Sequence, residues 1–212
     1  MAPGSALSQS ASPSDAGAVS SSGPMLLESI VVGRESGDLT PVIASMRTLG
    51  RLYWQRGDVR RARDAFDEAL ALARRIDMKL AISGLLVTLG DVALADQDLE
   101  SADDWYRQGI RASSRLAAPG SMAHAVRHYA AIRRARGDHW AAVRILSTIS
   151  SVHDAPELTL VALPAGDEEV EAAARLALGE DEFAMAWAEG KSLTLEQLTT
   201  EILSEVGGTI RR

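Results

Sequence analysis

The sequence contains no cysteine, which excludes disulfides, thiolate metal sites and cysteine nucleophiles. Aromatic residues make up only 4% of the 212 residues, so a core must be built mainly from Ala, Leu, Ile and Val. No stretch approaches the roughly 18 unbroken apolar residues that a membrane-spanning helix needs. The N-terminus also lacks the basic and apolar regions of a secretory signal. These absences predict a soluble, cytoplasmic protein of one domain, or one domain and a tail.

Residues that could carry out chemistry are few, because there are only four histidines. His124 and His128 have the four-residue spacing of metal ligands on a helix, but no third ligand follows and H-E-x-x-H is absent. The G-x-S-x-G motif of serine hydrolases is also absent. An acidic run fits a solvated helix start better than acid/base machinery; it comprises Asp167, Glu168, Glu169 and Glu171. The sequence therefore predicts no enzyme activity, no metal and no cofactor.

Charge is distributed unevenly along the chain, whose net charge is −7. Residues 41–150 carry a net charge of +5, whereas residues 1–40 carry −3 and residues 151–212 carry −9. This asymmetry permits either mutual shielding between the basic middle and the acidic end or an acidic ligand. The arginines are interspersed with acidic residues rather than gathered in a run. A protein or peptide ligand is therefore favoured over nucleic acid, which is kept as an alternative.

Composition divides the chain into four parts. Residues 1–24 are rich in Ser, Ala, Gly and Pro, so we expect them to be disordered. Residues 25–150 show apolar residues at helical spacing, and residues 151–165, with two prolines, are expected to form a linker loop. Residues 166–206 are expected to form a helical cap, in which Thr194 and Gln197 form a capping box that opens a last helix to about Glu205.

An internal repeat of 40 residues predicts the fold. The first copy begins at Leu49 and the second at Leu89, and a third, degenerate copy follows them. Half of an earlier copy precedes the first, at Leu26, Ser29 and Ile30. This organisation predicts an all-α solenoid of about three and a half antiparallel helical hairpins with a C-terminal helical cap. Gly57 and Gly137 mark the same turn, where the second copy has Gln97. The first two copies match at Leu49/Leu89, Gly50/Gly90, Asp58/Asp98, Ala62/Ala102, Phe66/Tyr106 and Ala69/Gly109, and the third continues at Tyr129, Ala130, Asp138, Ala142, Leu146 and Ile149.

The repeated residues have physical roles in a hairpin. A mid-helix glycine costs about 1 kcal/mol relative to alanine. Gly50 and Gly90 are therefore expected where a partner helix approaches closely, as Ala62 and Ala102 would allow. The aspartates that follow the turns, at positions 58, 98 and 138, are expected to be N-caps. The large residues at positions 66, 106 and 146 are expected to fill the seam between the helices.

The segment LG-x2-Y-x3-GD-x3-A-x3-F-x2-AL, from Leu49 to Leu70, resembles the consensus of the tetratricopeptide repeat. The period of 40 resembles the variant in MalT-like bacterial transcriptional regulators and related multidomain signalling ATPases. The stretch from Arg175, RLALGEDEFAMAWAEGKSLTLEQLTTEIL, resembles the motif that closes such arrays, and the resemblance covers about residues 25–206. It implies a non-enzymatic scaffold or sensor module that binds a protein or peptide in bacterial signal transduction or transcriptional regulation.

The sequence also departs from those relatives. They carry a nucleotide-binding module, whereas no G-x4-G-K-[ST] phosphate loop occurs here. The chain starts half-way through a repeat, so we expect a fragment, an excised array or a stand-alone descendant. The first helix, expected from Met25 to about Arg34, would lack its hairpin partner. The apolar face left under-covered would invite self-association or the docking of another domain.

The resemblance further implies which residues face the ligand groove, on the first helix of each hairpin. An aromatic residue flanked by arginines is a composition enriched in binding hot spots, and it would suit a peptide with acidic residues. The alternative is that Trp54 packs on the preceding helix and the arginines form a solvated face. The candidate peptide-binding residues are Arg47, Arg51, Trp54, Asp91, His124, Arg127 and Arg134.

Overall fold

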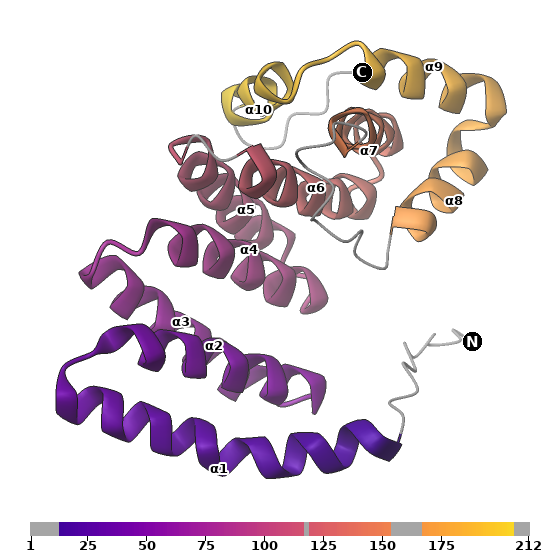
Figure 1. Ribbon diagram of the computed structural model, residues 1–212. Helices are drawn as coiled ribbons and strands as arrows, with labels where there is room; N and C mark the ends of the chain where they lie inside the picture. The colour runs from indigo at the N-terminus through magenta and orange to yellow at the C-terminus, as the bar shows by residue number, and fades with distance from the viewer. Residues whose placement is uncertain (1–12, 117–118, 154–166, 206–212) are drawn as a thin grey trace. The chain divides into compact units, whose positions relative to one another are not determined.

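The computed structural model describes residues 13–116, 119–153 and 167–205. In these ranges the chain forms ten helices and no strand (Figure 1), which confirms the all-α fold. Most of the helices that follow one another in the chain pack against each other, as stacked hairpins require. None of the helices in the described ranges is long and apolar enough to cross a membrane.

The chain divides into two compact units, Met1–Ala69 and Leu70–Arg212. The first unit contains α1 (Pro13–Ser36), α2 (Leu39–Gln55) and the beginning of α3 (Val59–Arg75). The second unit contains the end of α3 and seven further helices: α4 (Lys79–Ala95), α5 (Leu99–Ser114), α6 (Pro119–Ala135), α7 (His139–His153), α8 (Asp167–Leu178), α9 (Glu180–Lys191) and α10 (Leu195–Ser204).

Helices α2 to α7 begin at regular 20-residue intervals, so two helices make up each 40-residue repeat. In the turns between α2 and α3, α4 and α5, and α6 and α7, one residue has a positive φ. These residues are Gly57, Gln97 and Gly137, with φ of 78°, 61° and 78°. The next backbone N–H then donates to the carbonyl five residues earlier, which is the closing bond of a helix C-cap. Gly57 and Gly137 suit this conformation, whereas Gln97 adopts it despite the steric penalty on a side chain.

The aspartates that follow these turns are N-caps, as the sequence predicted. The carboxylate of Asp58 accepts a hydrogen bond from the backbone N–H of Arg61 at 3.1 Å. Asp98 and Asp138 accept equivalent bonds, also at 3.1 Å. Each cap satisfies one of the N–H groups that a helix start leaves without a partner.

The repeated glycines leave room for an aromatic ring. A Cβ atom built on Gly90 would lie 2.7 Å from Cδ1 and Cε1 of Tyr106, and one built on Gly50 would lie 2.6 Å from Cε1 of Phe66. Both rings are buried, so the seam-filling prediction is confirmed. The close neighbour of the glycine is this ring rather than the small Ala62 or Ala102 that we expected.

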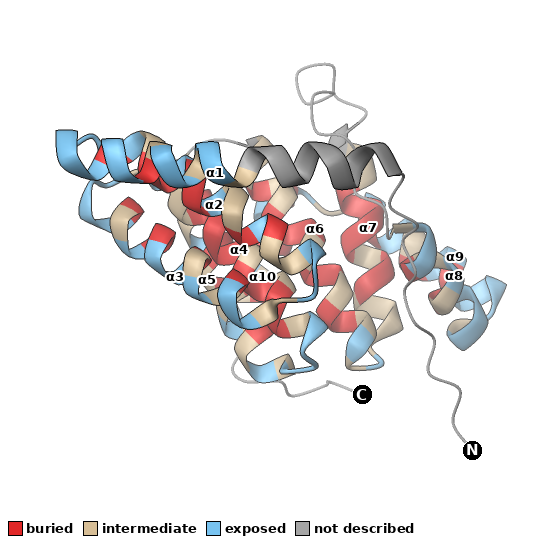
Figure 2. Cartoon of the chain, turned by 90° about the horizontal axis from the view of Figure 1, so that it is seen from below, coloured by how far each residue is buried: buried red, intermediate tan, exposed pale blue. Residues whose placement is uncertain are grey.

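The last three helices enclose the end of the second unit. Helices α8, α9 and α10 all contact α7, and α10 also contacts α5 and α6 (Figure 1). The backbones of α7 and α9 approach closely at Gly190, where the Thr148 hydroxyl donates to the Gly190 carbonyl at 2.7 Å. Thr194 and Gln197 form the expected capping box at the start of α10. Buried residues lie mainly on α2 and on α4 to α7 (Figure 2).

The structure differs from the expected boundaries at two places. Helix α1 begins at Pro13, inside the segment 1–24 that was expected to be disordered, while residues 1–12 lie outside the described residues. Extending an existing helix fixes fewer dihedral angles per hydrogen bond than starting one, so a packed helix can continue through a poor sequence. Helix α7 runs to His153, into the expected loop, whose residues 154–165 lie outside the described residues.

Two glycines on α4 provide a matched test of this packing. We expect Gly84→Ala to stabilise the protein by about 0.4–1 kcal/mol, because a Cβ there meets nothing within 4 Å and alanine favours the helix. Gly90→Ala should instead destabilise it by about 1–3 kcal/mol, because the Tyr106 ring must move. Urea unfolding measures both free energies. Stabilisation by both substitutions would contradict the close crossing of α4 and α5.

Candidate functional site

The candidate peptide-binding residues fall into both units. Arg47, Arg51 and Trp54 lie on α2 in the first unit. The other four lie in the second unit, with Asp91 on α4 and His124, Arg127 and Arg134 on α6. The structure therefore presents two groups, each held by its own set of helices.

The first group is an exposed basic surface on α2, which we call the α2 face: Arg47, Arg51 and Trp54. Arg47 and Arg51 are exposed and one helical turn apart, and Trp54 is half-buried three residues further on. Neither guanidinium makes an ion pair or hydrogen bond to any residue in the described part of the chain. Helix α2 itself contains no Asp or Glu that could neutralise them. The α2 face is thus a positive surface with an aromatic residue at one end.

Asp91 is committed to contacts inside the second unit. Its Oδ1 accepts a hydrogen bond from the Tyr106 hydroxyl at 2.7 Å and lies 2.7 Å from Nδ1 of His128. Burial, together with the charge and the hydrogen bond of Asp91, raises the pKa of the Tyr106 hydroxyl. Asp91 therefore ties α4 to α5 and α6, which gives its negative charge an internal role.

The two histidines of α6 form a ring pair beside Asp91. The rings of His124 and His128 have centroids 4.6 Å apart in an edge-to-face arrangement. Burial lowers the pKa of His124, and the nearby charges of His128 and Arg127 lower it further, while Asp91 opposes them. In the described ranges, no group of three or more His, Asp and Glu residues could hold a metal ion.

The prediction for Arg127 as a ligand-facing residue is wrong. Arg127 is 5% exposed, and its Nε lies 3.1 Å from both carboxylate oxygens of Asp167 at the start of α8. The resemblance implied that Arg127 faces a ligand, but α8 packs on α6 and its Asp167 binds the arginine. Arg134 is half-buried, and its Nε has no hydrogen-bond partner within the described residues.

Sequence reasoning missed a buried arginine network where α5 and α6 meet. Arg107 donates to Asp103 at 2.7 Å and to the Tyr129 hydroxyl at 2.9 Å. Tyr129 donates to Asp103 at 2.7 Å, and Arg136 donates to the same carboxylate at 3.0 Å. Burial alone would raise the pKa of Asp103, but these hydrogen bonds and positive charges outweigh it and hold the pKa below its usual value.

Arginines also hold α10 in place. Arg107 donates to the Ile202 carbonyl and Arg133 to the Glu205 carboxylate. Arg144 of α7 binds Glu201 with two hydrogen bonds, of 2.7 and 2.9 Å. The hydrogen bond from Arg144 lowers the pKa of Glu201, despite the opposing effect of burial.

The charge asymmetry of the sequence was the available signal for these contacts. It left open whether the basic middle binds the acidic end or an external ligand. In the second unit, arginines of α6 and α7 bind carboxylates of α8, α9 and α10 and that of Glu205, just beyond α10. Mutual shielding therefore accounts for much of the asymmetry there. The α2 face differs in that its arginines are exposed and have no ion pair within the described residues.

No known family model and no curated protein matches this chain. The three groups Asp103, Glu201 and Tyr106, whose pKa values are shifted, all form hydrogen bonds to other residues of the fold.

The lowered pKa of His124 predicts that stability depends on pH. The unfolded chain should bind a proton near pH 6.5 while the folded chain resists it, so stability should be full above pH 6.5 and fall as the pH drops below it. Asp103 and Glu201, whose pKa values are also lowered, should add a further loss only at lower pH. Urea unfolding at pH 7.5 and 5.5 measures the loss due to His124.

His124→Gln should remove most of the change between pH 7.5 and 5.5. His139→Gln on α7 is the matched control and should keep it. An unchanged pH dependence in His124→Gln would show that another group is responsible.

Proposed function

We propose that this protein is a non-enzymatic protein- or peptide-binding module whose ligand is an acidic segment that docks on the α2 face. The observation that carries the proposal is that Arg47 and Arg51 are exposed, adjacent and without an ion pair in the described residues, beside the half-buried Trp54. Many arginines of the second unit, in contrast, are already paired with carboxylates. Arginine and tryptophan are the residue types most often found at binding hot spots.

The regular scaffold supports the family resemblance. The 40-residue period, the aspartate caps and the glycine–aromatic crossings recur as they would in tetratricopeptide-like repeats. From this resemblance to MalT-like arrays, we propose that the protein acts in bacterial signal transduction or transcriptional regulation, in the cytoplasm. Its ligand would then be a protein of the same regulatory system.

Two alternatives remain distinct from this proposal. A nucleic-acid-binding solenoid would need a continuous basic surface, and the internal pairing of Arg107, Arg127, Arg133 and Arg144 argues against one in the second unit. A fragment of a larger signalling ATPase would show no binding by itself. Affinity for a duplex that falls steeply with salt would favour the first alternative.

Substitutions on the α2 face test the proposal. Acidic peptides selected from a displayed library on the wild-type protein should lose at least about 2 kcal/mol of binding free energy with Trp54→Ala. Arg51→Glu should slow their association, because it reverses a charge that attracts the peptide. Fluorescence anisotropy gives the affinities, and stopped-flow mixing gives the association rates.

Arg60→Glu is the matched control, since Arg60 is an exposed arginine of the same unit on α3. It should leave the affinity nearly unchanged. If Trp54→Ala instead lowers the melting temperature and leaves peptide affinity intact, Trp54 is a packing residue and the α2 face is not the binding surface.

We also propose that α1 mediates self-association. Its large apolar residues Met25, Leu27, Val31 and Val32 are 71%, 52%, 53% and 55% exposed. Leu27 and Val31 are four residues apart and share one side of the helix. Residues 23–33 carry only one charge, on Glu28, so this side offers a second copy an apolar complement with little repulsion. Figure 2 shows how much of the described part of α1 is exposed.

Sedimentation velocity tests this association. We expect the wild-type protein to form dimers with rising concentration, and Leu27→Ser with Val31→Ser to shift it towards the monomer. Both residues are exposed, so the substitutions should leave the helical circular dichroism unchanged. A wild-type protein that stays monomeric across the concentration range would rule out self-association through α1.

A further inference from the structure

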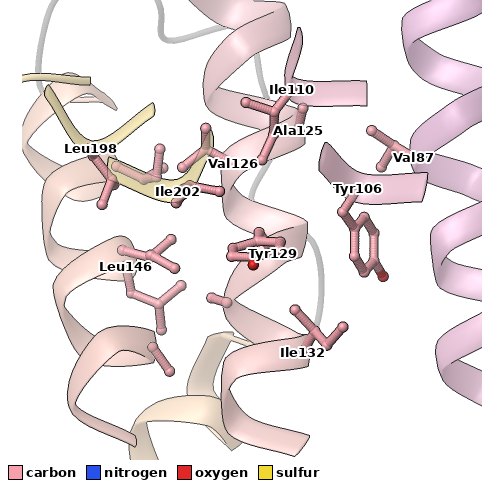
Figure 3. Packing of buried hydrophobic residues seen from close by; sticks show 14 of the residues in the cluster. Val87, Tyr106, Ile110, Ala125, Val126, Tyr129, Ile132, Leu146, Leu198 and Ile202 are labelled. Carbon is pink, nitrogen blue, oxygen red and sulfur yellow. The ribbon is translucent and has the colours of Figure 1, made fainter. Parts of the chain in front are cut away.

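Helix α10 lies in the second unit as a short amphipathic helix on a surface made by α5, α6 and α7. Its apolar residues Leu195, Leu198 and Ile202 belong to one buried cluster with Tyr129 and Leu146. Figure 3 shows Leu198 and Ile202 within this cluster. The three apolar residues follow the i, i+3, i+7 spacing by which a helix binds in a complementary surface.

The charged contacts of α10 are concentrated at its C-terminal end. Arg107 donates to the Ile202 carbonyl in the last turn, where a helix leaves carbonyls without partners and its dipole is negative. Arg133 binds Glu205 just beyond the helix, and Arg144 binds Glu201. The surface therefore recognises the orientation of the helix as well as its apolar residues. We call these arginines, with the apolar cluster on α6 and α7, the α10 site.

The contact between α10 and the rest of the unit resembles the binding of a helical ligand. Arg107 and Arg133 are each only 7% exposed, and a buried charge without its partner is strongly destabilising, so these arginines favour a helix that brings matching acceptors. A ten-residue helix is also too short to be stable by itself in water. It is joined to α9 by only Ser192, Leu193 and Thr194. Helix α10 thus depends on its site for its structure, and another helix with the same features could replace it.

We propose that the α10 site is a docking surface for an amphipathic, acidic helix of a partner protein, and that α10 occupies this site until the partner displaces it. The partner helix has apolar residues at i, i+3 and i+7, carboxylates at i+6 and i+10, and its C-terminal end against Arg107 and Arg133. These are the positions of Leu195, Leu198, Ile202, Glu201 and Glu205 in α10. The proposal does not use the α2 face.

A peptide of residues 192–205, labelled with fluorescein, serves as the probe. The full chain carrying Leu198→Ser and Ile202→Ser loses the apolar contacts of its own α10 but keeps the receiving surface. Fluorescence anisotropy should show that this variant binds the peptide at least tenfold more tightly than the wild-type chain does. A peptide with the same two substitutions should not bind.

Substitutions in the receiving surface locate the binding. Adding Arg144→Gln to the double variant should weaken peptide binding at least fivefold, because Glu201 loses its partner. Arg111→Gln, an exposed arginine of α5, is the matched control and should have no effect. Trp54→Ala should also have no effect, so a failure of the α2 face and a failure of the α10 site can be told apart.

Native-state hydrogen exchange on the wild-type chain decides the outcome if the double variant does not fold. A displaceable α10 should exchange its amide protons at least tenfold faster than α6 does, through local opening. Equal exchange in α6 and α10 would overturn the proposal, as would a folded double variant that binds the peptide no better than the wild type. Either result would show that α10 is a permanent part of the core.

Discussion

The close crossing of the two helices in a hairpin depends on a glycine that leaves space for an aromatic ring of the partner helix. In the second unit, Gly90 makes this space on α4 and the ring of Tyr106 on α5 occupies it. The crossing also decides where the Tyr106 hydroxyl lies, and it reaches Asp91. Because Asp91 also contacts His128, one missing side chain sets the geometry of a polar contact that joins three helices. His124 packs against His128 beside that contact, and its pKa is lowered by burial and by the charges of His128 and Arg127, while Asp91 opposes them.

Electrostatic pairing then completes the second unit. Arginines of α6 and α7 bind carboxylates on α8, α9 and α10. In a partly buried setting such pairs are worth more than on the surface, and leaving one partner alone is costly. The last helices are therefore held by specific ion pairs, which fix both their position and their orientation. This pairing neutralises positive charge that would otherwise attract a ligand. The arginines of α2, which have no ion pair in the described part of the chain, are therefore the clearer candidates for binding.

Much of the local structure could be predicted from the residues. Asp58 and Asp98 were identified as caps because a side chain satisfies the first N–H groups of its own helix, which needs no distant contact. Gly57 and Gln97 marked turns for the same local reason. The role of Arg127 could not be predicted, because its partner Asp167 is forty residues away on a helix whose position no periodicity specifies. The extension of α1 to Pro13 was missed because composition describes an isolated segment rather than one that continues a packed helix.

The sequence by itself determined the all-α hairpins, their 40-residue period, their caps and their buried seam, because each of these depends on residues within one or two helices. It also determined that the chain has a basic middle and an acidic end. Only the tertiary structure decided which arginines bind which carboxylates and which remain exposed. The reason is that helical spacing gives the face on which a side chain lies, whereas the neighbour that covers this face is selected by the packing of helices far apart in the chain.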